Sequence, residues 1–393
     1  MAIDALSSKK AGALAVIAVS GVSLMCIPAV ARPAGTADHR PAPASAGGGG
    51  GGAAPGAPKL PGGLSALSWT VADADSGSVL ASKDAHRKLA PASTLKTLFA
   101  VTVLPKFSAG TVRQVSAADL DGIGAGSSVV GVRKGERYKV GDLWRGVFLR
   151  SGNDAVHVLA SMNGGWKVTA REMQETARKL GARDTTVKSP DGYDAPGQVS
   201  SAFDLTVFAR AGLANADFAR YCSTVRADFP SAGGTTRIEN TNRLLAGSQG
   251  MARYPGIIGV KNGYTTNAGN TLIAAARRDG RTLLVTVMNP QSGEANGVYK
   301  EARSLLDWGF RSAGKAQPVG TLRTTGVTHG AGGPPAQTVA HSAEADDEAR
   351  DGSTWRSAVA LWAGGVGALV LAAGALLAWR MHARRDSSGG GPS

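Results

Sequence analysis

Two long stretches of this chain are too rich in glycine, alanine and proline to pack, and they confine any folded domain to the sequence between them. Residues 32–63 include the consecutive glycines Gly47 to Gly52, and residues 314–357 are again polar and rich in Gly, Pro and Ala. Such segments bury too little apolar surface to offset the entropy lost on ordering. We therefore expect two flexible linkers and one folded domain over residues 64–313.

The N-terminus has the pattern of a secretory signal peptide. Two lysines precede an apolar run, which ends in a small-x-small sequence at Ala31 that is typical of signal-peptidase sites. We expect residues 1–31 to be removed by cleavage after Ala31. One alternative is an uncleaved N-terminal anchor. The other is lipidation at Cys26, although this cysteine lacks the small residue that normally precedes a lipoprotein cysteine.

The C-terminus has the pattern of a single membrane-spanning helix. Residues 358–379 contain no charged side chain and are long enough to cross a bilayer, which takes about 20 residues. Arginines follow this span and an acidic cluster precedes it. This asymmetry predicts that residues 380–393 are cytoplasmic and that the folded domain lies outside the cell membrane, on the cell-wall side. A buried core helix is the alternative, but the linker and short tail on either side leave it nothing to pack against.

Charge, cysteine and histidine content narrow the function classes. The net charge is +14, but the basic residues are spread along the chain and no nucleic-acid motif occurs, so the expected partner is an anionic cell surface rather than a nucleic acid. If the signal peptide is removed, Cys222 is the one cysteine that remains, so an internal disulfide cannot form. The six histidines show no paired ligand spacing, so we expect no metal and no cofactor.

The domain between the linkers begins and ends with strand patterns. Residues 68–72 and 79–80 flank an Asp-Ser-Gly turn, and residues 271–276 and 282–288 flank an Arg-Asp-Gly turn, so two hairpins are predicted. Helical patterns lie between and after them. We expect an α/β (α+β) fold, in which an antiparallel sheet is closed by its first and last segments and flanked by helices. The predicted helices cover residues 93–104, 166–180 and 298–310.

A serine three residues before a lysine is the first chemical signal, but it is not unique. Ser93 follows Pro91 at a predicted helix start, where side chains three residues apart share one face. A buried Lys96 there would lose its proton readily and act as a base for the serine hydroxyl. The pattern occurs three times, at Ser7 and Lys10, at Ser93 and Lys96, and at Ser312 and Lys315.

Two further motifs follow Ser93 in order, namely Ser151-Gly152-Asn153 and Lys261-Asn262-Gly263. With the Ser93/Lys96 pair, they resemble the signature of the serine penicillin-recognising enzymes, which joins Ser-x-x-Lys, Ser-x-Asn and Lys-Thr-Gly. The nearest resemblance is to the low-molecular-mass D-alanyl-D-alanine carboxypeptidases of the peptidase S11 type. It extends over roughly residues 64–312.

This resemblance implies a β-lactamase/transpeptidase-like fold, whose antiparallel sheet is accompanied by a mostly helical subdomain. It implies a serine-type D-Ala-D-Ala carboxypeptidase that removes the terminal D-alanine from peptidoglycan stem pentapeptides, with β-lactam antibiotics as covalent inhibitors. The implied catalytic residues are Ser93 as nucleophile, Lys96 as base and Ser151 as proton relay. The implied substrate-binding residues are Asn153, Lys261, Asn262, Gly263, Tyr264 and Thr265.

The sequence departs from the family pattern at two positions. Asn262 replaces the threonine that helps to bind the terminal carboxylate, and Thr265 is a candidate to share that contact. Thr241 stands where some members carry an arginine, so Arg243 or Arg253 is a candidate source of the charge.

Two other functions remain open at this point. A serine β-lactamase would need a glutamate to activate the deacylating water. The other alternative is a non-catalytic wall-binding protein of the same fold. The glutamates available between the second and third motifs are Glu172, Glu175 and Glu239.

Overall fold

The folded part of the chain is built on one antiparallel sheet. The computed structural model describes residues 52–53 and 56–322. Within them the strand order is β1-β3-β2-β10-β9-β8, and β11 also pairs with β3. The order places the domain's first hairpin beside its last, as predicted, and leaves β8 at an edge. The strands are β1 (Gly52–Ala53), β2 (Ser68–Asp73), β3 (Ser78–Lys83), β8 (Ile257–Thr265), β9 (Gly269–Arg278), β10 (Arg281–Met288) and β11 (Gly320–Thr321).

Both predicted hairpins are confirmed. β2 and β3 are joined through Gly77, whose φ of 76° lies in the left-handed region that favours glycine. β10 pairs with both β9 and β2, and Val285 lies opposite Ala274 on one side and Val71 on the other. All three of these side chains are buried. Apolar side chains suit these central strands, because helices cover both faces of the sheet and exclude water from them.

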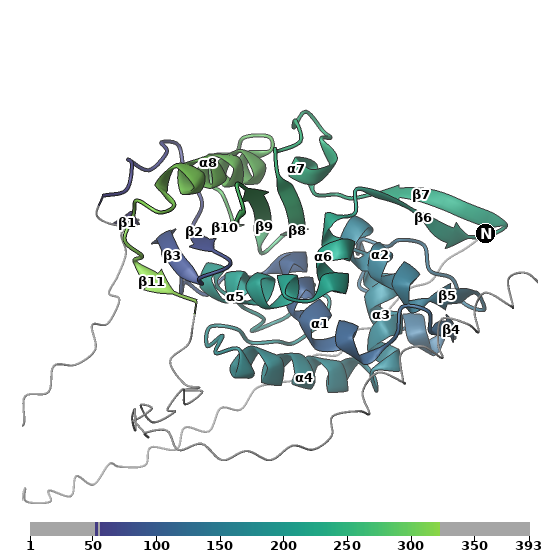
Figure 1. Cartoon of the computed structure of the whole chain (residues 1–393). Helices are drawn as coiled ribbons and strands as arrows, with labels where there is room; N and C mark the ends of the chain where they lie inside the picture. The colour runs from purple at the N-terminus through teal and green to yellow at the C-terminus, as the bar shows by residue number, and fades with distance from the viewer. Residues whose placement is uncertain (1–51, 54–55, 323–393) are drawn as a thin grey trace, which may run out of the picture. The chain divides into compact units, whose positions relative to one another are not determined.

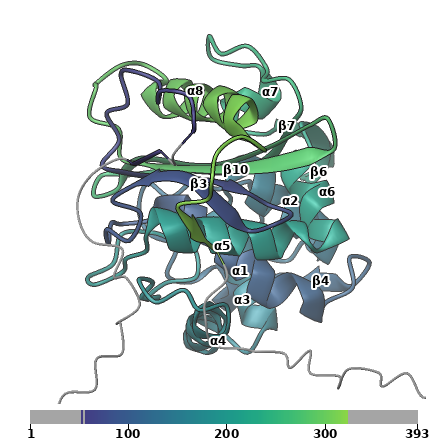
Figure 2. The same cartoon turned by 60° about the vertical axis from the view of Figure 1, so that its left-hand side comes forward.

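Helices flank the two faces of the sheet (Figure 2). α8 (Gly297–Ser312) contacts β2, β9 and β10 on one face, and α5 (Ala202–Leu213) contacts the same three strands from the other. The apolar stripe predicted for α8 is confirmed, since Val298, Ala302, Leu305 and Trp308 are all buried. The other helices lie on the α5 side of the sheet, except for the short α7 (Figures 1 and 2).

The remaining elements are helices, short 3₁₀ turns and two small two-stranded sheets. They are η1 (Ala92–Leu95), α1 (Lys96–Val103), η2 (Leu104–Lys106), β4 (Val112–Gln114), η3 (Ala118–Leu120), β5 (Arg137–Lys139), α2 (Val140–Arg150), α3 (Asn153–Met162), α4 (Trp166–Lys179), α6 (Ala216–Ser223), β6 (Arg226–Ser231), β7 (Gly234–Glu239) and α7 (Arg243–Ala246). The predicted helix over residues 93–104 is present as η1, α1 and the start of η2. The β6–β7 hairpin was not predicted, because exposed polar residues dominate β7.

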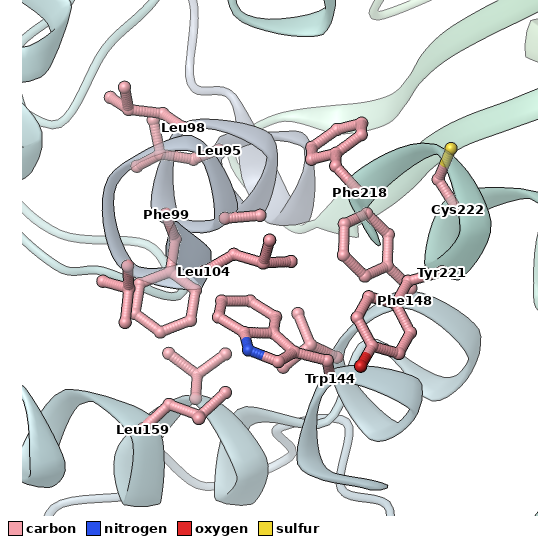
Figure 3. Packing of buried hydrophobic residues seen from close by; sticks show 14 of the residues in the cluster. Leu95, Leu98, Phe99, Leu104, Trp144, Phe148, Leu159, Phe218, Tyr221 and Cys222 are labelled. Carbon is pink, nitrogen blue, oxygen red and sulfur yellow. The ribbon is translucent and has the colours of Figure 1, made fainter. Parts of the chain in front are cut away.

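An aromatic core holds α1 in place (Figure 3). The rings of Phe99 on α1 and Trp144 on α2 have centroids 5.3 Å apart, and Phe148 on α2 meets Phe218 on α6 edge-on at 5.1 Å. Leu95 and Leu98 belong to the same buried cluster. Since burying such side chains is the main stabilising term in folding, the first turn of α1 is rigidly anchored beside the sheet.

The ordered contacts extend past both predicted ends of the domain. β1 and β11 pair with β3, and Trp308 Nε1 donates a hydrogen bond to the carbonyl of Pro58 at 2.9 Å. The backbone groups of β1 and β11 form hydrogen bonds with the edge of β3 that does not face β2. The composition of the flanking segments does not predict this pairing. The predicted signal peptide (1–31), transmembrane helix (358–379) and tail (380–393) lie outside the described residues. Within 52–53 and 56–322, no helix has both the length and the apolarity to span a bilayer.

Candidate active site

Ser93 and Lys96 meet at the start of the helix that follows β3. Ser93 lies in η1, and Lys96 begins α1. The Nζ of Lys96 lies 2.8 Å from the Oγ of Ser93. The three-residue spacing therefore brings the two groups together, as the sequence predicts. Ala92, directly before the serine, has a φ of 49°, a backbone conformation that is uncommon for a residue with a side chain.

Lys96 is buried without a carboxylate bonded to its amine. Its side chain is 1% exposed, and Nζ donates a hydrogen bond to the carbonyl oxygen of Asp191 at 2.6 Å. Burial lowers the pKa of Lys96 from 10.5 to about 8, although the charges of Asp191 and Asp154 partly oppose this shift. A neutral amine within hydrogen-bond distance of a serine hydroxyl can accept its proton.

The Ser151-Gly152-Asn153 motif forms the junction of two helices. Ser151 ends α2 with a φ of 58°, and Asn153 begins α3. The Asn153 Nδ2 donates to Ser127 Oγ at 3.0 Å. Within the described part of the chain, the Oγ of Ser151 and the Oδ1 of Asn153 are buried and lack a hydrogen-bond partner. Unpaired buried polar atoms are costly, and at an active site they are available to a ligand.

Lys261 on β8 is a second buried cation close to the first. It is 1% exposed, and its Nζ donates to the carbonyl oxygen of Asn262 at 2.8 Å. Burial, together with the nearby charge of Lys96, holds the pKa of Lys261 well below its usual value. Burial disfavours the charged form of both amines, and an anionic group bound beside them would raise their pKa values and favour protonation.

Gly263 allows the β8 strand to approach the nucleophile. A Cβ at this position would lie 2.7 Å from the backbone nitrogen of Ser93 and 2.7 Å from Thr271 Oγ1. No side chain fits there, so glycine is required by the close approach rather than by its backbone angles. Tyr264 follows, and its side chain is 68% exposed at the edge strand.

The side chains of Asn262 and Thr265 are already engaged. Asn262 Oδ1 accepts a hydrogen bond from Thr241 Oγ1 at 3.0 Å, and its amide interacts with the hydroxyl of Tyr299 on α8. Thr265 Oγ1 accepts from the backbone N–H of Ala268 at 3.1 Å and so stabilises the β8–β9 turn. The acceptor oxygens of both side chains are therefore occupied, while the hydroxyl hydrogen of Thr265 and one amide hydrogen of Asn262 can still be donated to a substrate carboxylate.

Thr241 connects the second and third motifs. Besides its bond to Asn262, its backbone N–H donates to the carbonyl of Leu149, two residues before Ser151. The guanidinium of Arg243, a candidate for the missing charge, donates to Asn296 Oδ1 and lies 5.4 Å from the Tyr299 ring centroid. Arg243 is thus held against α8.

Two acidic residues near the site were not assigned a role from the sequence. The Asp154 carboxylate accepts backbone N–H bonds from Val130, Gly131 and Val132, and so fixes the loop that carries Ser127. Asp191 supplies the carbonyl that accepts from Lys96. The only available signals were their places beside Asn153 and in Ser189-Pro190-Asp191-Gly192. In residues 52–53 and 56–322, no three His, Cys, Asp or Glu side chains gather to hold a metal ion.

Known proteins resemble this chain in sequence and structure. The sequence pattern of Peptidase_S11, described as D-alanyl-D-alanine carboxypeptidase, matches residues 55–292. D-alanyl-D-alanine carboxypeptidase DacB2 of Mycobacterium tuberculosis is 41% identical over 248 residues, which cover 62% of this chain and 82% of the relative. DacD of Escherichia coli is 34% identical, and the match covers 63% of each chain.

Solved structures agree with the sequence relatives. The crystal structure of a D-alanyl-D-alanine carboxypeptidase from M. tuberculosis matches with a TM-score of 0.62 and 38% identity, covering 68% of this chain and 99% of the other. The Streptomyces K15 DD-transpeptidase matches with a TM-score of 0.59 and 27% identity, covering 64% of this chain and 99% of the other.

Proposed function

The chain belongs to the peptidase S11 family of D-alanyl-D-alanine carboxypeptidases, and we propose that Ser93 is the residue on which its acyl-enzyme forms. The observation that carries this assignment is the 2.8 Å contact between Ser93 Oγ and a buried Lys96 whose pKa is lowered to about 8. The substrate is the D-Ala-D-Ala end of a peptidoglycan stem peptide.

Acylation begins when Ser93 Oγ forms a bond to the carbonyl carbon of the penultimate D-alanine. The serine proton passes to neutral Lys96, and the backbone N–H groups of Ser93 and Tyr264 bind the oxyanion. The carbon–nitrogen bond then breaks, and the departing D-alanine nitrogen takes a proton through Ser151. Water hydrolyses the ester and restores Ser93. The short approach of Gly263 to the Ser93 nitrogen supports this placement of the oxyanion donors.

The substrate is held at its two ends by different groups. Asn153 Oδ1, which has no partner among the described residues, accepts from the peptide N–H of the substrate. Lys261 attracts the terminal carboxylate, and this anion raises the pKa of Lys261 and so favours its charged form. Because Asn262 is engaged with Thr241 and Tyr299, we assign it a secondary part in carboxylate binding, through its remaining amide hydrogen.

We propose that β-lactam antibiotics acylate the same serine and that the resulting acyl-enzyme is hydrolysed slowly. Two of the three glutamates that a β-lactamase could use form ion pairs with other residues, and the third is exposed. Glu172 pairs with Lys106 at 2.6 Å, and Glu239 pairs with Arg226 at 2.6 Å. Glu175 lies on the exposed side of α4. This arrangement favours a carboxypeptidase over a β-lactamase. A glutamate held in an ion pair, or one exposed on a helix, is poorly suited to activate a deacylating water.

The deciding experiment measures D-alanine release from a stem pentapeptide by the wild-type protein and by Ser93→Ala. We expect the variant to lose at least about 10³-fold in kcat/KM and to form no penicillin adduct by mass spectrometry. Ser312→Ala is the matched control, since Ser312 belongs to another Ser-x-x-Lys pair but only donates to the Trp308 carbonyl. A wild-type protein that binds wall peptides without releasing D-alanine would instead indicate the non-catalytic alternative.

We also propose that a signal peptide (1–31) exports the domain and that residues 358–379 anchor it to the cell membrane. Sequence alone supports this proposal: the span is uncharged and the arginines after it predict a cytoplasmic C-terminus. Truncation after residue 357 should release the activity from the membrane fraction. Retention of the truncated protein on membranes would count against the C-terminal anchor.

A further inference from the structure

The carbonyl oxygen of Asp191 restrains the amine of Lys96. Among the described residues, Lys96 Nζ has two hydrogen-bond partners, Ser93 Oγ at 2.8 Å and this carbonyl at 2.6 Å. A neutral amine carries two hydrogens and one lone pair, and the lone pair must face the serine hydroxyl to take its proton. A hydrogen donated to Asp191 limits the rotation of the amine, so the position of this carbonyl bears directly on proton transfer.

The segment that carries this carbonyl has no secondary structure to hold it. Residues 187–194 lie between α4 and α5 and belong to neither a helix nor a strand. In the described part of the chain, none of their backbone groups forms a hydrogen bond with another backbone group. The segment also packs against the nucleophile, because a Cβ on Gly192 would lie 2.0 Å from the Ala92 oxygen. Side chains must therefore fix the shape of this loop.

Gln198 supplies most of these side-chain contacts. It is 5% exposed, and its Oε1 accepts the backbone N–H of Lys188 at 2.9 Å and that of Ser189 at 2.7 Å. Its Nε2 donates to the carbonyl of Tyr193 at 2.7 Å and to Ser189 Oγ at 3.1 Å. One amide thus uses both of its hydrogens and both of its acceptor positions to clamp the backbone on either side of Asp191.

The carboxylate of Asp191 extends this clamp. Its Oδ1 accepts from Ser189 Oγ at 2.8 Å and from the backbone N–H of Tyr193 at 3.0 Å. Because Ser189 Oγ accepts in turn from Gln198, a continuous chain of hydrogen bonds leads from Gln198 to the residue that holds Lys96. Gln198, Ser189 and Asp191 are all buried, so solvent does not replace a lost partner easily.

We propose that Gln198 is a positioning residue for the catalytic base. It holds the Asp191 carbonyl against Lys96 and so keeps the lone pair of the amine directed at the serine hydroxyl. Without the clamp, the carbonyl takes up other positions, and fewer molecules have the amine in the geometry that accepts the proton. Gln198 therefore acts on the rate of acylation rather than on binding. This inference rests on the proposed function, in which Lys96 is the base.

Gln174 on α4 offers a matched control, because its amide holds the same loop at its far end. Its Oε1 accepts the backbone N–H of Val187 at 2.9 Å, and its Nε2 donates to the carbonyl of Thr185 at 3.0 Å. These bonds are of the same kind but do not enclose Asp191. Methionine is close to glutamine in volume and forms none of them, so Gln198→Met and Gln174→Met compare the two clamps with little change in packing.

The test is single-turnover acylation by penicillin, which separates the binding of penicillin from its reaction with Ser93. For Gln198→Met we expect the acylation rate constant to fall by on the order of 10²-fold, with the dissociation constant of the preceding complex changed by less than about threefold. The kcat/KM for D-alanine release should fall with it. Gln174→Met should keep both rates within about threefold, although each variant should unfold at a lower denaturant concentration because each leaves backbone groups unpaired.

Ser189→Ala is a second variant, which removes the hydroxyl between Gln198 and the Asp191 carboxylate but leaves the backbone contacts of Gln198 in place. We expect acylation to slow by roughly tenfold. This variant carries the test if Gln198→Met does not fold. Acylation by Gln198→Met as fast as by Gln174→Met would overturn the positioning role, and so would wild-type acylation by Ser189→Ala where Gln198→Met is not folded. The role of Ser93 is tested separately, by Ser93→Ala, and would stand in either case.

Discussion

Lys96 at the candidate active site and Asp119 beside the paired strands β4 and β5 are both hidden from solvent, at 1% exposure each, yet their surroundings have opposite effects on their charge. Lys96 contacts a hydroxyl and a carbonyl oxygen. Asp119 accepts hydrogen bonds from the Arg113 guanidinium, from the Ser116 backbone and from the Ser161 hydroxyl. One buried charge is left poorly compensated, and the other is surrounded by donors.

The pKa values follow this difference. For Asp119, burial alone would raise the pKa, but the hydrogen bonds from Arg113, Ser161 and Ser116 outweigh it and hold the pKa well below the usual 3.8. For Lys96, burial prevails over the charges of Asp191 and Asp154. Burial by itself therefore does not mark a catalytic group. A buried charge without compensating partners does, because it has been left ready to lose its proton.

Replacing Lys96 with methionine should have the largest effect on activity and should make the folded protein more stable. We expect kcat/KM to fall by about 10³-fold or more, because the base is gone. The lowered pKa means that the protonated amine costs folding on the order of 3 kcal/mol at pH 7, so removing it should raise the free energy of unfolding.

Chemical denaturation and D-alanine release, measured on the same preparations, check both halves of this prediction. Lys96→Arg is the matched control, since it keeps a charge that cannot act as a base and should lose both activity and stability. A Lys96→Met protein that was inactive and also markedly less stable would show that the lysine is mainly structural.

Replacing Asp119 with asparagine should produce the reverse pattern. The variant leaves Arg113 without its carboxylate, and we expect the free energy of unfolding to fall by about 2–3 kcal/mol. At temperatures where it is folded, kcat/KM should stay within about threefold of wild type. Asp217→Asn removes an exposed ion pair with Arg220 and should change stability by less than about 0.5 kcal/mol. Equal stability of the Asp119→Asn and Asp217→Asn variants would show that the hydrogen bonds around Asp119 do not stabilise the fold.

The pH dependence of the wild type tests the same comparison without a substitution. Below the Lys96 pKa of about 8, kcat/KM should decline by about tenfold per pH unit as the base becomes protonated. The Asp119 contribution to stability has another window: its folded pKa is depressed, so the contribution is complete above 3.8 and is lost only as pH falls further. Between pH 8 and pH 6, kcat/KM should therefore fall by about 100-fold while the protein stays folded. Full activity at pH 6 would exclude neutral Lys96 as the base.

Much of the fold was predictable because its signals are local. The β2–β3 and β9–β10 hairpins follow from strand patterns around turn residues, and α8 follows from an apolar stripe. The β6–β7 hairpin escaped prediction, since exposed threonines and an arginine fill one strand and conceal the alternation. β1 and β11 escaped as well, because each is a two-residue pairing with β3 that only the folded sheet makes possible.

The candidate site shows the same division. Spacing alone brought Lys96 to Ser93, because three residues make nearly one helical turn, and the three motifs identified the family. Only the tertiary structure decided that Lys96 is buried and bonded to the carbonyl of Asp191, and that Lys96 lies close enough to Lys261 to help lower the pKa of Lys261. It also decided that Asn262 is engaged with Thr241 and Tyr299. Burial and long-range charge depend on residues distant in the chain, and a sequence motif specifies which groups are present but not how strongly their surroundings favour or oppose a charge.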